Sequence, residues 1–204
     1  MDEPFSNLDY QLRQHLRYEI RNILKNQGIA TILVTHDQIE AITFADRLLL
    51  MQNGELLQSG SPIEIYQYPK TLWASTFIGE ANHLQAEWRG KSLISPLGII
   101  DVPAEIGEKT KVLMVRPEDI FIESATEKDS NGKIKSIDFA GSTQTIVVQL
   151  NNGEQIQISE PPHFSRLNGD FVKITIRRFL CFNNSGEKIR GFPPEGTLNL
   201  SGNQ

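Results

Sequence analysis

The spacing of apolar residues changes near residue 80 of this chain. Between Tyr10 and Gln27, apolar residues recur every three to four positions, which predicts an amphipathic helix that ends at Gly28. Residues 29–36 (IATILVTH) form an apolar run of strand length. Such a run is typical of a strand buried on both faces, as in a parallel sheet.

The polar face of the predicted helix carries three arginines, Arg13, Arg17 and Arg21, each four residues from the next. Like charges at this spacing weaken an isolated helix slightly. We interpret the arginines as a solvated face rather than as a binding stripe.

Shorter elements follow in the same region. DQIEAITFA predicts a short helix, and LLLMQNGELLQ predicts a hairpin, because Asn53 and Gly54 can adopt the positive φ values of a type I′ turn. SPIEIY predicts another helix, in which Ser61 and Glu64 have the spacing of a capping box. TLWASTFIGE predicts one more helical segment.

After Gly79 the runs become short and rich in β-branched and aromatic residues. They are KVLMVRPEDIFIE, KIKSIDFAG, STQTIVVQL, EQIQIS and DFVKITIRRFLCF. Short strands at this spacing favour a small all-β barrel or sandwich. We therefore expect an α/β region over residues 1–80 and an all-β region over residues 81–204, with a loosely ordered tail from Gly186.

Composition narrows the classes of protein. The 204 residues suffice for one or two domains, and 39 % hydrophobic residues are ordinary for a globular chain. The net charge is -5, so the chain lacks the basic excess expected of a nucleic-acid binder.

A single cysteine, Cys181, excludes an internal disulfide framework, and we expect no metal cluster from it with His15, His83 and His163. No apolar run approaches membrane-spanning length, so any membrane role would depend on a partner subunit.

The chain opens with two adjacent carboxylates, Asp2 and Glu3. On an extended chain they point to opposite sides, so one could hold Mg²⁺ through water while the other orients a water that faces a phosphate. Alone, they are better interpreted as a solvated turn. His36, however, follows the predicted parallel strand, where open α/β sheets bind ligands. If the two strand ends are neighbours, Asp2, Glu3 and His36 converge in one crevice.

An ordered series of segments carries a resemblance to a known family. MDEPFSNLD resembles the Walker B and D-loop segment of ABC transporter ATPases, and VTHDQIEA resembles their switch-histidine segment. ADRLLLMQNGELLQSGSPIEIYQYP resembles the stretch that follows in importer ATPases. FIGEANHL, VRPEDI and the β-rich tail resemble their regulatory extension, an OB-like domain called TOBE. The resemblance implies the C-terminal part of a P-loop NTPase domain followed by an OB-like regulatory domain.

The resemblance also implies roles for single residues. Asp2 would hold Mg²⁺ through water, Glu3 would polarise the attacking water, and His36 would contact the γ-phosphate of ATP. Ser6 and Asp9 would bound the D-loop, which meets a second ATPase subunit across a homodimer and borders the nucleotide. Asn7 departs from the alanine that is commoner in that loop.

The partners implied by the family are transmembrane permease subunits and a periplasmic or extracellular substrate-binding protein, with the ATPase at the cytoplasmic face of a bacterial membrane. FIGEANHL is nearest to ferric-iron importers. Sugar or polyamine import, and a noncatalytic regulatory or dimerisation module, are the alternatives.

For the β-rich region we rank a structural and dimerising role first, binding of a regulatory ligand or inhibitory protein second and oligonucleotide binding last. Its one suggestive cluster, Arg177-Arg178-Phe179, is better interpreted as a strand with mixed faces.

Three family motifs are missing from the sequence. The phosphate-binding P-loop needs G-x-x-x-x-G-K-[ST]. The single GKS triplet, Gly90-Lys91-Ser92, has Gln85 where the first glycine should stand, so we interpret it as a turn. The glutamine loop and an LSGGQ-like signature are absent too. We expect the chain to be the downstream part of a longer ATPase, inactive by itself, with reduced stability and exposed apolar surface in residues 1–80.

Overall fold

The computed structural model describes residues 1–6, 8–162 and 166–192. The chain divides into two compact units, the first comprising Met1–Lys70 with Phe77–Gly79 and the second Thr71–Thr76 with Glu80–Gln204. In the part of the chain that is described, no helix combines the length and the apolar character needed to cross a membrane.

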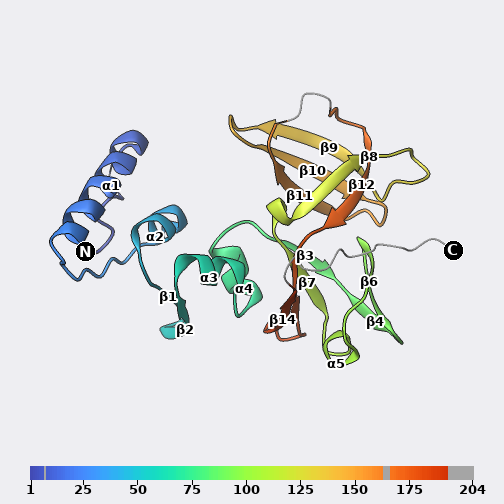
Figure 1. The fold of residues 1–204 in the computed structure, drawn as a ribbon, viewed down its shortest axis with the longest axis horizontal. Coiled ribbons are helices and arrows are strands. Elements are labelled where there is room, and N and C mark those ends of the chain that lie inside the picture. Colours follow the sequence, from blue (N-terminus) through green and yellow to red (C-terminus); the bar gives the residue numbers. More distant parts are fainter. Residues whose placement is uncertain (7, 163–165, 193–204) are drawn as a thin grey trace. The chain divides into compact units, whose positions relative to one another are not determined.

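The first unit contains the predicted helices and hairpin (Figure 1). Its elements in chain order are α1 (Tyr10–Asn26), α2 (Gln38–Phe44), β1 (Leu48–Gln52), β2 (Glu55–Gly60) and α3 (Pro62–Gln67). The helix α1 ends in a Schellman motif: the amides of Gly28 and Ile29 bond the carbonyls of Lys25 and Leu24, and Gly28 has φ +65°.

The turn and cap predictions are confirmed. Asn53 and Gly54 have φ values of 51° and 83°, as a type I′ turn between β1 and β2 requires. Ser61 and Glu64 form both hydrogen bonds of a capping box at the start of α3. These local signals are short-range, so they hold without the rest of the fold.

The prediction of a strand buried on both faces at residues 29–36 is wrong. Among the described residues, the β-pairing of this run is a single parallel bridge between Val34 and Asp2. Ile32 and Val34 are 81 % and 56 % exposed. A parallel strand is buried only when strands flank it and helices cover it, and among the described residues only the short segment Met1–Glu3 pairs with this run. The exposed apolar surface expected in the first unit is present.

The interpretation of the three arginines as a solvated face is also wrong. Arg17 is only 7 % exposed, and all three arginines point at α2 or the residues that flank it. The apolar stripe of α1 is instead partly open, since Ile23 is 53 % exposed. The three guanidinium groups bind oxygens of α2 or of the residues that flank it.

The second unit includes α4 (Leu72–Phe77) except for its last residue. It is otherwise mainly antiparallel β-structure, with short helices α5 (Ala104–Gly107) and η1 (Pro117–Asp119). One sheet has the order β11 (Gln155–Glu160), β10 (Gln144–Leu150), β9 (Gly132–Phe139), β12 (Phe171–Ile176) and β8 (Ile120–Ser124). A second sheet has the order β14 (Lys188–Phe192), β13 (Phe179–Phe182), β7 (Val112–Val115) and β3 (Asn82–Gln85). A third contains β4 (Glu87–Arg89), β5 (Ser92–Ser95) and β6 (Gly98–Ile100).

One apolar cluster joins the three sheets, which confirms the all-β expectation. It includes Leu84, Leu93, Ile134, Ile158 and Cys181, each at most 2 % exposed. β7 and β13 are buried on both faces, because a second cluster of Val112, Met114, Leu180 and Phe182 lies on their other side, against Leu72 and Ala81. This explains why VLMV and FLCF are continuous apolar runs.

Three details of the second unit bear on the sequence predictions. Gly90 and Lys91 form the turn between β4 and β5, as expected for the GKS triplet. The prediction of a loosely ordered tail from Gly186 is wrong for β14, which pairs with β13. The rest of the predicted tail, from residue 193, lies outside the described residues. Arg177 and Arg178 lie between β12 and β13 rather than within a strand, and Arg178 pairs with Asp119 at 2.8 Å.

Candidate functional site

Backbone hydrogen bonds bring the N-terminal segment beside residues 32–34. The Met1 nitrogen donates to the Ile32 carbonyl at 2.8 Å, the Val34 amide donates to the Met1 carbonyl at 2.9 Å, and the Glu3 amide donates to the Val34 carbonyl at 2.9 Å. The two segments run parallel and therefore end side by side. Glu3 then turns the chain, with φ +41°.

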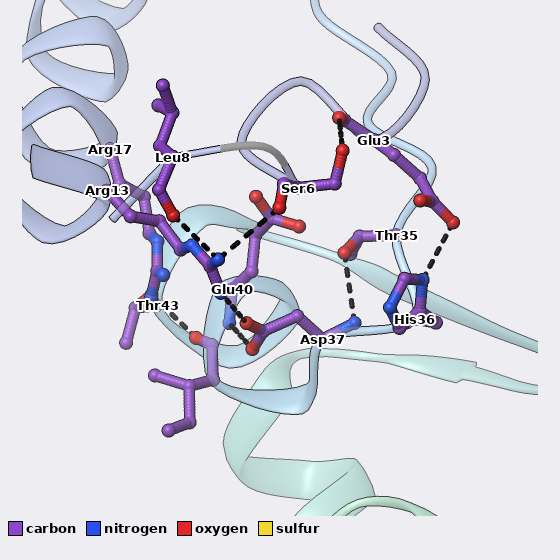
Figure 2. Close-up of polar contacts among 11 residues, drawn as sticks. Glu3, Ser6, Leu8, Arg13, Arg17, Thr35, His36, Asp37, Glu40 and Thr43 are labelled. Carbon is purple, nitrogen blue, oxygen red and sulfur yellow. Dashed lines mark hydrogen bonds and ion pairs between the residues drawn. The ribbon is translucent and has the colours of Figure 1, made fainter. Parts of the chain in front are cut away.

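The ends of these segments place Glu3 against His36 (Figure 2). Glu3 Oε1 lies 2.7 Å from His36 Nδ1, a hydrogen-bonding distance. Both side chains are open to solvent, with 45 % and 75 % of their surfaces exposed. The pair is therefore reachable by a ligand or a water molecule.

Ser6 joins the pair through the backbone. Its amide and its hydroxyl both donate to the Glu3 carbonyl, at 3.3 and 3.0 Å. Asp9 has another position, because its carboxylate accepts from the Leu12 amide and caps α1. Asp2 is exposed on the parallel bridge.

A small cavity of about 150 Å³ adjoins the pair. It is lined by Glu3, Phe5, Ser6, Arg13, Thr35, His36, Asp37 and Glu40. Of the five predicted site residues, the cavity thus brings together Glu3, Ser6 and His36. Asp2 and Asp9 are not among its lining residues.

Several residues of this cavity were not assigned a role from the sequence. Asp37 caps α2 by accepting from the Glu40 amide at 2.9 Å, and its own amide donates to Thr35 Oγ1 at 3.0 Å. The hydrogen bond from the Glu40 amide, with the positive charges of Arg17 and Arg13, holds the pKa of Asp37 below its usual value, against the effect of partial burial. Asp37 therefore remains charged at neutral pH. The Asp-x-x-Glu spacing after His36 was the available signal for this cap.

Glu40 is the most buried polar residue of this group. It is 3 % exposed, and its Oε1 has no hydrogen-bond partner among the described residues. Arg13 and Arg17 approach the same region from α1 (Figure 2). Nothing in the sequence pattern distinguished these buried charges from solvated ones.

The chemistry that these residues offer is acid–base chemistry at an open carboxylate–imidazole pair. A carboxylate can accept a proton from a water molecule, and an imidazole beside it holds it in one orientation. Within the described part of the chain, no group of three or more His, Cys, Asp or Glu side chains could hold a metal ion. Asp2 offers one exposed carboxylate, which fits a single water-mediated contact to Mg²⁺ but not a complete metal site.

Comparison with known proteins gives one domain match and a set of relatives for the chain as a whole. Residues 113–178 match the TOBE domain. The chain is 38 % identical over 173 residues to a spermidine/putrescine import ATP-binding protein PotA of Aliivibrio fischeri, covering 78 % of this chain and 46 % of that protein. It is 35 % identical over 181 residues to an Fe(3+) ions import ATP-binding protein FbpC 2 of Pectobacterium atrosepticum, covering 86 % of this chain and 52 % of that protein.

The chain thus spans about half the length of these curated relatives. Its first unit has a single parallel bridge between Asp2 and Val34, and its second unit contains the residues that match the TOBE domain. The chain therefore carries a TOBE domain and resembles, through most of its length, the ATP-binding subunits of ABC importers.

Proposed function

We propose that residues 1–80 supply the catalytic carboxylate and the switch histidine of an ATP-hydrolysing subunit of an ABC import system. The observation that carries the proposal is the 2.7 Å contact between Glu3 and His36 at the ends of two parallel segments. In this proposal Glu3 orients and polarises the water that attacks ATP, and His36 holds the Glu3 carboxylate and contacts the γ-phosphate.

The remaining predicted residues have supporting roles. Asp2 would hold Mg²⁺ through water, and bound Mg²⁺ would neutralise charge on the phosphates of ATP. Ser6 hydrogen-bonds the Glu3 carbonyl, so it fixes the turn after the catalytic carboxylate. Asp9 would act at the second ATPase subunit only indirectly, since its carboxylate caps α1.

The test is a protein that contains both this chain and an upstream P-loop segment. We expect Glu3→Gln to abolish ATP hydrolysis while ATP still binds, because the amide cannot accept the proton of the water. Glu19→Gln is the matched control, since Glu19 is an exposed carboxylate on α1. Unchanged hydrolysis in the Glu3→Gln protein would reject the role of Glu3.

For the cargo, ferric iron was expected from FIGEANHL. The relatives carry names for both spermidine/putrescine and Fe(3+) import, at 38 % and 35 % identity. We therefore propose import by an ABC system and assign the cargo by uptake of labelled spermidine and labelled Fe³⁺ in cells that lack the gene. The proposed partners are transmembrane permease subunits, a second ATPase subunit and a substrate-binding protein, with the chain at the cytoplasmic face of the membrane.

For the second unit we propose a structural and dimerising role. Most of its apolar strand residues are buried in two clusters, and Arg178 of the basic pair is engaged by Asp119. That ion pair removes one of the two cations that oligonucleotide binding would use.

A further inference from the structure

Arg13 contacts both of the loops that carry the candidate catalytic pair. Its Nη2 donates to the Leu8 carbonyl at 2.9 Å and, at 3.5 Å, to the Ser6 carbonyl. Its Nη1 lies 3.4 Å from Asp37 Oδ2 (Figure 2). One guanidinium therefore links the turn that follows Glu3 to the residue that follows His36.

Each end of this link is connected to one member of the pair by a short path. On one side, the Ser6 amide and hydroxyl bond the Glu3 carbonyl. On the other, Asp37 is adjacent to His36, and its amide donates to Thr35 Oγ1. A displacement of either loop therefore reaches the Glu3–His36 contact through few intervening groups.

The Arg13 guanidinium is suited to hold the two loops in a defined position, beyond the effect of its charge. A planar guanidinium presents several donors in fixed directions, which a lysine ammonium does not. The Arg13 and Asp37 side chains are about 70 % covered, with 28 % and 30 % exposed, so solvent screens their interaction less than that of surface pairs. The Asp37 side chain is also held by α2, because it caps the N-terminus of that helix.

We propose that Arg13 is a positioning residue whose guanidinium couples the Ser6–Leu8 turn to the His36 segment and so holds His36 against Glu3. The catalytic meaning of this coupling rests on the proposed function, but the coupling itself is a property of this chain without nucleotide. In an intact enzyme it would transmit a movement of the turn at a subunit contact to the switch histidine.

The experiment uses the 204-residue chain without nucleotide and measures the NMR shifts of the His36 imidazole at one pH. The quantity of interest is the change in these shifts caused by Glu3→Gln, measured in the parent and in variants. We expect a clear change in the parent and in Arg21→Gln, the control, because Arg21 lies on the same face of α1 but bonds Phe44 and Asp46. In Arg13→Gln we expect the change to be lost, and in Arg13→Lys to be reduced.

Folding of the variants is checked by their amide spectra. If Arg13→Gln does not fold, Asp37→Asn replaces it, because asparagine still caps a helix while the ion pair is removed. A folded Arg13→Gln or Asp37→Asn chain that keeps the full response to Glu3→Gln would overturn the proposal. Loss of the response together with normal ATP hydrolysis by the Glu3→Gln protein would reject the catalytic role of Glu3 and leave the coupling standing.

Discussion

At the scale of single residues, the site was partly predictable. Glu3 and His36 both follow short extended segments, and the rule that parallel strand ends meet at one edge placed them together. Arg13 could not be found in this way. Its spacing from Arg17 is the same whether the side chain is solvated or buried, and only the tertiary positions of Leu8 and Asp37 decide between them.

A prediction at the same scale concerns His83. Its Nε2 lies 2.8 Å from Ser75 Oγ, and partial burial, followed by the charge of Arg116, lowers the pKa of the imidazole. A lowered pKa in the folded state means that the unfolded chain binds the proton more tightly. The contribution of neutral His83 to the unfolding free energy is therefore fully present above the unfolded pKa of about 6.5, and it is lost as pH falls below that value.

We expect the unfolding free energy of the second unit to fall between about pH 7 and about pH 5, and His83→Gln to flatten this dependence. Tryptophan fluorescence during urea unfolding measures it, since Trp73 and Trp88 both lie in the second unit. His15→Gln, an exposed histidine on α1, is the control. An unchanged slope in the His83→Gln chain would exclude His83 as its source.

At the scale of elements, local signals predicted more than burial did. The Schellman motif at Gly28, the type I′ turn at Asn53-Gly54 and the capping box at Ser61 depend on neighbours in sequence, and all three are present. Burial depends on what lies across an element. The run at 29–36 is therefore exposed. β14 was missed because its pairing with β13 and the packing of Ile189 against the core are tertiary contacts that the local sequence does not show.

The helix α1 allows a test of whether burial or hydrophobic pattern decides the effect of a residue on stability. By hydrophobic pattern alone, Ile23 should matter more to stability than Arg17. The structure reverses this order, because Arg17 is buried and donates to Thr43 Oγ1 at 3.3 Å, whereas Ile23 is half exposed. We expect Arg17→Ala to lower the unfolding free energy of the first unit by about 1–3 kcal/mol, and Ile23→Ala by about 0.5 kcal/mol or less. Urea unfolding followed by far-ultraviolet circular dichroism measures both, and a larger loss for Ile23→Ala would contradict the burial order.

At the scale of the whole molecule, the two regions of different hydrophobic spacing correspond to an α/β unit with an incomplete parallel pairing and a β unit with a closed core. The second unit was the more predictable, because alternating strands such as those in residues 144–150 and 171–176 specify one buried face each. The first unit brings Glu3 beside His36, but the 204-residue sequence contains no G-x-x-x-x-G-K-[ST] loop.

That absence leads to the last prediction. ATP binding by P-loop ATPases depends on backbone amides and a lysine that surround the phosphates. Glu3, His36 and Asp2 supply neither. We expect calorimetric titration of the 204-residue chain with Mg²⁺–ATP to give no measurable heat of binding, while the full-length PotA of Aliivibrio fischeri, titrated in parallel, binds. Micromolar affinity in this chain would mean that groups other than a P-loop hold the phosphates. The roles proposed here for Glu3, His36 and Arg13 would then have to be reassigned.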